Sequence, residues 1–161
     1  MPCKLCEEKP VWKFTNQRNL CSRCFVEYFE KKVKSTIRKY KIPVNKIKGN
    51  SLKADVINNI IKGLPERKGK VSLDNLDNIS NSIFYTVMHG DKKDLQILKI
   101  KNQPLYFLSN KEILLYAKIK RIKGKIEENR KLIEINNFIQ KIEEKNPDIR
   151  QNVVNALNNS I

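Results

Sequence analysis

The chain has 161 residues, enough for one ordinary domain and a small additional module but too few for a nucleotide-dependent enzyme with two full lobes. It carries 33 Lys and Arg against 17 Asp and Glu, a net charge of +16. No apolar run approaches the roughly 18 residues that span a bilayer, and no signal peptide is evident. We therefore expect a cytoplasmic protein without a membrane partner.

The positive charge is concentrated in the first three quarters of the chain. Residues 1–48 hold 13 basic and 4 acidic groups, residues 49–124 hold 14 and 7, and residues 125–161 hold 6 and 6. Such a surface favours a polyanion as partner, through phosphate neutralisation and counterion release. The alternative is an ordinary solvated surface in a lysine-rich and asparagine-rich proteome.

All four cysteines lie in two Cys-x-x-Cys pairs near the N-terminus, Cys3 and Cys6 followed by Cys21 and Cys24. Two such pairs can complete a tetrahedral Cys₄ shell around Zn²⁺, and the 14 intervening residues are one short of the usual ribbon spacing. Residues 11–14 alternate and a polar turn follows, which predicts a β-hairpin. Two disulfides or a redox dithiol pair are the alternatives. We predict a structural zinc ribbon over residues 1–24, folded by its metal.

An amphipathic helix is predicted directly after the second cysteine pair. Phe25, Phe29, Val33 and Ile37 recur every four residues, and the pattern continues to about Tyr40. Basic side chains recur on a different face, which we call the basic stripe: Lys31, Lys34, Arg38 and Lys41. With Lys32 and Lys39, the basic stripe gives our candidate RNA-binding residues.

The remaining chain reads as mostly helical. Helices are expected over 52–61, from about Asp77 to His89, from a capping box at Ser109–Glu112 through Ala117, from about Glu127 to a stop before Pro147, and from an Asp148 cap onward. In the fourth of these, Ile135, Phe138, Ile139 and Ile142 are expected to face inward. Residues 71–73 are a candidate strand and residues 95–100 a candidate extended segment.

The predicted fold is mainly α with an N-terminal β-hairpin ribbon. An α+β variant of this prediction adds a small remnant parallel sheet of two or three strands. We divide the chain into the ribbon (1–24), the basic helix and its connection (25–48) and a mostly helical domain (49–161). None of the five glycines forms a phosphate-cradling loop, and the single His89 has no second histidine or spare cysteine beside it. The pattern therefore favours a protein that is not an autonomous enzyme.

Four stretches of the chain resemble a known family. The paired cysteines followed by residues 25–40 resemble the N-terminal zinc ribbon and helix of archaeal and eukaryotic tRNA 2-thiolation proteins, members of the PP-loop ATP-pyrophosphatase superfamily. Residues 74–78 through Asp91 resemble the family's His-Asn-Leu-Asp-Asp to Arg-Gly-Asp segment. Residues 103–117 and 138–149 are similar to its later helices.

The departures from the family bear on activity. The resemblance implies an ATP-dependent tRNA sulfurtransferase, yet the family's Ser-Gly-Gly-Lys-Asp-Ser nucleotide loop and its catalytic cysteines are missing, and its second aspartate is Asn78 here. We therefore expect a shortened, non-catalytic relative that binds tRNA or another structured RNA, as an accessory subunit to a full-length paralogue. The alternatives are an adaptor for a sulfur-carrier protein or a catalytic paralogue, and a thiolase completed in trans.

Overall fold

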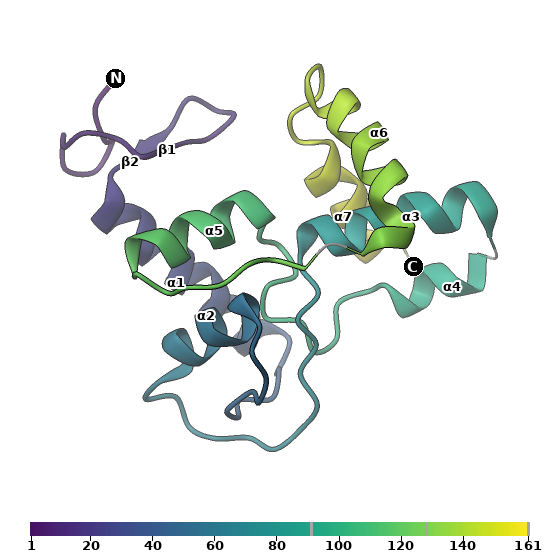
Figure 1. The fold of residues 1–161 in the computed structure, drawn as a ribbon, viewed down its shortest axis with the longest axis horizontal. Coiled ribbons are helices and arrows are strands. Elements are labelled where there is room, and N and C mark those ends of the chain that lie inside the picture. Colours follow the sequence, from purple (N-terminus) through teal and green to yellow (C-terminus); the bar gives the residue numbers. More distant parts are fainter. Residues whose placement is uncertain (91, 128, 161) are drawn as a thin grey trace.

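The computed structural model describes residues 1–90, 92–127 and 129–160, and within them the fold is mainly helical with one small hairpin (Figure 1). Strands β1 (Trp12–Lys13) and β2 (Asn19–Leu20) are followed by helices α1 (Ser22–Lys39), α2 (Leu52–Ile61), α3 (Leu76–His89), α4 (Lys92–Ile97) and α5 (Asn110–Ile119). A short 3₁₀ turn, η1 (Arg130–Leu132), leads into α6 (Ile133–Glu143), and α7 (Ile149–Asn159) comes last. The predicted fold class is confirmed.

One hydrophobic cluster joins the hairpin to the first two helices and α5. Every fourth residue of α1, namely Phe25, Phe29, Val33 and Ile37, is buried, as the periodicity predicted. Tyr116 of α5 stacks on Phe29 with ring centroids 4.4 Å apart. The buried side chains of α1 pack in one cluster with residues of the hairpin and of α5. Close packing of this kind fixes the position of α1 relative to both.

A second hydrophobic cluster is formed by residues of α3 and α7, the helices at the right of Figure 1. Leu76, Ile79 and Ile83 of α3 pack there with Val154 and Leu157 of α7. Tyr106 is fully buried between these helices, and its hydroxyl donates a hydrogen bond to the carbonyl of Leu98 at 2.8 Å. The division of the chain at residues 24 and 48 remains a prediction.

Side-chain hydrogen bonds cap the starts of α2 and α5. The Ser51 side chain accepts a hydrogen bond from Ala54 N and begins α2. The Ser109–Glu112 capping box is present at the start of α5, with both reciprocal hydrogen bonds formed. Asp148 stands at the start of α7, but no side-chain hydrogen bond caps that helix, which corrects the role expected for it.

Three expectations about extended structure were wrong. The only sheet in the part of the chain that the structure describes is the antiparallel β1–β2 pair, so the optional parallel sheet is not found there. Residues 71–73 form no strand. Residues 95–97 belong to α4 instead of an extended segment, because Leu95 and Leu98, three residues apart, both pack against the second cluster.

The helix expected from Glu127 begins only at Ile133. Its inward face is narrower than predicted, since Ile135 and Ile139 are buried while Phe138 is 51% exposed. The buried face of α6 therefore has one residue per turn, and Phe138 lies at the edge of that face. No helix among the described residues has the length and apolar character needed to cross a bilayer.

Alkaline pH is expected to destabilise this fold. Burial, followed by hydrogen bonding or nearby charge, raises the pKa of Tyr28 and Tyr116, and burial raises the pKa of Tyr106 to about 12. Above pH 10 the unfolded chain loses tyrosine protons that the folded chain keeps, so the free energy of unfolding should fall as pH rises toward 12. Denaturant midpoints measured from pH 9 upward test this, and a flat profile beyond pH 10 would contradict it.

Candidate metal centre and basic face

The first 24 residues form a hairpin that carries both cysteine pairs. β1 and β2 pair antiparallel, with Trp12 opposite Leu20, and Phe14 N donates to Arg18 O at 2.8 Å to close the turn. Gln17 takes a positive φ of 62° in that turn, and Glu7 takes 63° after the first cysteine pair. The predicted ribbon hairpin is confirmed, and it lies at the N-terminal end of α1.

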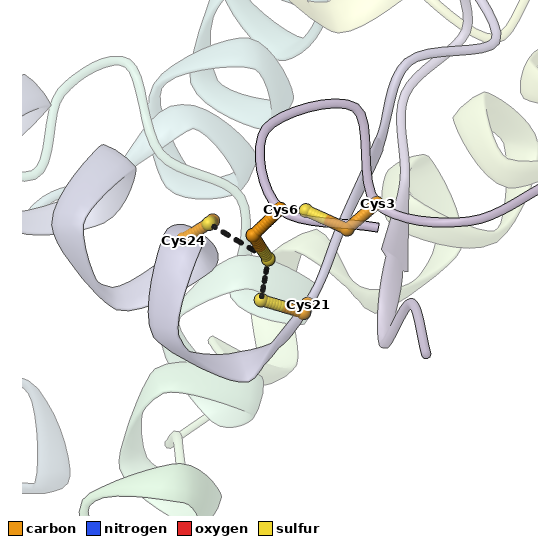
Figure 2. Close-up of side chains that lie close together, drawn as sticks. All are labelled: Cys3, Cys6, Cys21 and Cys24. Carbon is orange, nitrogen blue, oxygen red and sulfur yellow. Dashed lines mark hydrogen bonds between the residues drawn. The ribbon is translucent and has the colours of Figure 1, made fainter. Parts of the chain in front are cut away.

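The four cysteine sulfurs come together at this end of α1. Cys3 and Cys6 belong to the first loop, Cys21 immediately precedes α1, and Cys24 lies in its first turn; Figure 2 shows their side chains grouped at one place. All four Sγ atoms lie within 4.8 Å of one another. Cys6 Sγ is 3.3 Å from Cys21 Sγ and 3.6 Å from Cys24 Sγ.

This spacing fits one tetrahedral ion. Metal–sulfur bonds of about 2.3 Å place tetrahedral sulfurs about 3.8 Å apart, which is close to the separations seen. A cluster of several metal atoms spreads its thiolate ligands over different corners and needs wider spacing. Cys3, Cys21 and Cys24 are buried and Cys6 is half-buried. A single ion bound by all four sulfurs would have no open position for a substrate.

The electrostatics of the thiols also favour a bound cation. Burial alone raises the pKa of Cys3, but hydrogen bonds from backbone N–H groups, including that of Leu5, outweigh it and lower the pKa to about 6. Burial and the neighbouring thiols raise the pKa of Cys24 to about 12. Four thiolates cannot share so small a volume without a positive ion, and a metal displaces these protons when it binds.

The candidate RNA-binding residues lie along α1 and just beyond it. Lys31, Arg38, Lys39 and Lys41 are exposed. Lys34 Nζ is 3.4 Å from Glu30 Oε2 on the same helix. The basic stripe therefore has a solvent-facing edge, with Lys34 partly neutralised within it.

Lys32 is engaged inside the protein. Its ammonium group donates to the Tyr28 hydroxyl at 2.9 Å and lies 3.6 Å from Glu112 Oε1 of α5. Because Tyr28 also donates to Glu112 at 3.1 Å, these three side chains tie α1 to α5. Lys32 is thus placed as a structural link as well as a candidate contact.

Two neighbouring concavities follow the exposed side of α1. One, of about 620 Å³, is lined by residues between Glu27 and Lys39, and the small Ser35 leaves a depression between longer side chains. The other, of about 450 Å³, lies where the ribbon meets α1 and includes Arg18, which the sequence did not single out. Both are lined by Glu27, Lys31 and Ser35, so they form one continuous surface.

A buried polar network occupies the segment that resembles the family's Asn-Leu-Asp stretch. Lys53 Nζ of α2 donates to Asn75 Oδ1 at 3.0 Å and also to Asn78 Oδ1. Asp77 Oδ2 accepts from Asn110 N at 2.7 Å. Burial lowers the pKa of Lys53, while the charges of Asp74 and Asp77 oppose that shift. Asp91, the end of the resembling segment, lies outside the described residues.

The same network continues to Arg150 of α7, which is 4% exposed. Its guanidinium donates to Ser80 Oγ at 2.9 Å and to Asn81 Oδ1 at 2.6 Å, and its Nε lies 3.1 Å from Glu143 Oε1. A pocket of about 30 Å³, room for about one water molecule, adjoins it. Arg150 thus links α7 to α3, through Ser80 and Asn81, and to α6, through Glu143.

The fold and site together define a mainly helical protein that begins with a four-cysteine ribbon. No family model matches the chain, and no curated protein matches it. Among solved structures, it is similar to the U34-tRNA thiolase NcsA from Methanococcus maripaludis, described with its 4Fe–4S cluster. The TM-score is 0.78 at 14% identity, and the match covers 98% of this chain and 86% of that one. This likeness establishes the fold.

Proposed function

We propose that this chain is a zinc-containing, non-catalytic RNA-binding protein related to the tRNA thiolation proteins. The observation that carries the proposal is the basic stripe on α1, directly continuous with a ribbon built on four converging cysteines. It would bind tRNA or another structured RNA through Lys31, Lys32, Lys34, Arg38, Lys39 and Lys41. The fold likeness to a tRNA thiolase over 98% of the chain supports tRNA as the first RNA to test.

Zinc is the metal that we propose for the ribbon. Four sulfurs within 4.8 Å suit a single ion better than the 4Fe–4S cluster named for the similar thiolase. A closed Cys₄ shell is the usual arrangement of structural zinc, which stabilises a module too small for its own core. The ion would hold the ribbon against α1 and take no part in chemistry.

A non-catalytic role is supported by where the reactive side chains are. All four cysteines of the chain belong to the one cluster, which leaves none to carry a persulfide. His89 is exposed at the end of α3, where its ring stacks on Tyr85 at 4.6 Å and its Nδ1 lies 3.2 Å from the Tyr85 carbonyl. We infer a shortened relative that acts as an accessory subunit to a full-length paralogue.

Charge reversal on α1 tests RNA binding directly. The double substitution Lys31→Glu and Arg38→Glu should weaken tRNA binding strongly and reduce the slope of log affinity against log salt by about 2, because two phosphate contacts are lost. The measurement is fluorescence anisotropy on labelled tRNA over a salt series. Lys34 is left unchanged because Glu30 already pairs with it.

The matched control reverses two exposed lysines of the charge-balanced C-terminal part, Lys141→Glu and Lys145→Glu. It changes the net charge by the same amount. If both double variants lose affinity equally, binding depends on overall charge and the proposed surface is wrong.

A second candidate function is the protein adaptor, favoured by exposed apolar side chains near the ends of α3 and α4. Val87 and Met88 near the end of α3 and Ile97 at the end of α4 are 67%, 59% and 66% exposed. An adaptor would co-purify with a sulfur-carrier protein or a paralogue after nuclease treatment. ATP turnover that appears only in a mixture with such a partner would instead identify a thiolase completed in trans.

A further inference from the structure

The junction between the ribbon and α1 is a concavity with charged side chains in its lining, which the sequence did not predict. It has a volume of about 450 Å³. Leu5 and Arg18 line it from the ribbon, and Glu27, Tyr28 and Lys31 line it from successive turns of α1. Two parts of the chain that are separate in sequence therefore contribute cationic side chains to one place.

Arg18 is held in this concavity by an aromatic contact. Its guanidinium carbon lies 5.9 Å from the centre of the Phe14 ring, and Phe14 in turn packs edge-on against Tyr28 at 5.0 Å. The orientation is therefore set by the hairpin and α1 together. Such a fixed guanidinium loses little conformational freedom when it binds a ligand.

Arg18 also has an unsatisfied donor. Its Nε is buried and has no hydrogen-bond partner among the described residues. Because Nε itself is buried, a ligand in the concavity would meet the terminal N–H groups of the guanidinium. A guanidinium binds oxyanions of phosphate and carboxylate in a fork geometry.

The charges around the concavity favour an anion. Lys32 is already paired with Glu112 at 3.6 Å, whereas no ion pair of Arg18 or Lys31 is found in the described part of the chain. Glu27 is the single acidic residue that lines the concavity, against three basic ones. Arg18 and Lys31 therefore supply the available positive charge.

We propose that Arg18 and Lys31 together bind one phosphate group of an RNA backbone at the ribbon–helix junction. This inference rests on the RNA binding proposed above and specifies where a strand is anchored. Since the junction and the neighbouring concavity of α1 both include Lys31, the strand would continue from this anchor toward Arg38. Arg18 acts here as a binding residue, and the ribbon as the element that positions it.

The substitution Arg18→Gln tests the anchor, with Lys13→Gln on β1 as the matched control. Lys13 is exposed on the same hairpin and loses the same charge. Arg18→Gln should lower tRNA affinity about tenfold or more, as expected for a charged hydrogen bond, and reduce the salt slope by about 1. Lys13→Gln should change affinity less than about twofold, and Arg18→Lys should recover the salt slope but only part of the affinity.

Three outcomes separate this inference from the proposed function. Equal affinities for Arg18→Gln and Lys13→Gln, with normal binding by the unmodified protein, would overturn the anchor alone. If the unmodified protein binds no RNA, yet inorganic phosphate shifts the Arg18 Nε–H resonance, RNA binding is wrong and a phosphate site stands. If neither tRNA nor inorganic phosphate shifts that resonance, the anchor is overturned, whether or not Arg18→Gln folds.

Discussion

Removal of the metal should unfold the ribbon and loosen the N-terminal end of α1. The hairpin has only two residues in each strand, and few of its residues, Leu20, Cys3 and Cys21 among them, are buried in the first hydrophobic cluster. Structural zinc contributes about 10–16 kcal/mol of apparent binding free energy in small zinc modules. Without the metal, only weak thiol contacts and limited apolar packing would keep the four cysteines together.

Trp12 reports this change because it is the one tryptophan of the chain and lies on β1. Its ring packs against Phe25 of α1, with centroids 5.5 Å apart. Addition of a chelator should shift Trp12 emission toward that of exposed indole. Amide protons under α3 and α7 should keep their protection, since the second hydrophobic cluster contains no ribbon residue. Unchanged Trp12 emission after complete metal removal would contradict the metal-folded ribbon.

Replacement of the buried Arg150 should cause a large loss of stability. Arg150→Ala removes the donor that serves Ser80, Asn81 and Asn136 and leaves the charges of Asp77 and Glu143 without their buried partner. Loss of one member of a buried ion pair costs about 3–5 kcal/mol. We expect about 3 kcal/mol, the low end, because Asp77 and Glu143 keep 18% and 26% of their side-chain exposure.

Urea denaturation measures this cost, and Arg130→Ala provides the control. Arg130 is an exposed arginine of η1 and should change the free energy of unfolding by less than about 0.5 kcal/mol. Arg150→Met, which keeps the packing volume but removes the charge, separates cavity formation from loss of the ion pairs. A loss below about 1 kcal/mol for Arg150→Ala would show that the network contributes little.

Features governed by local chemistry were predictable from the sequence. The four-residue spacing of Phe25, Phe29, Val33 and Ile37 identified the buried face of α1 correctly. The start of α5 followed from Ser109 and Glu112, whose reciprocal hydrogen bonds need only the residues of one turn. The convergence of the cysteines followed in the same way, because each Cys-x-x-Cys pair sets its own two sulfurs side by side.

Features that depend on distant residues were not predictable. Nothing near Arg150 in the sequence indicates that it reaches Ser80, 70 residues away. Arg18 looked like an ordinary turn residue, and only the packing of the hairpin on α1 brings it beside Lys31. The short apolar run around Leu95 fits a strand or a helix equally well, and the second cluster decided in favour of helix.

We propose that a metal-folded ribbon and the basic stripe of α1 form one RNA-binding surface. The most direct test is the affinity of the natively purified protein for tRNA, measured across a salt series before and after metal removal, with the bound metal quantified in the same samples. We predict one zinc per chain, a slope of log affinity against log salt of about −3 from three or four phosphate contacts, and a large loss of affinity after metal removal. Absence of zinc, no binding at low salt, or binding that depends on neither salt nor metal would contradict a zinc-dependent RNA-binding surface.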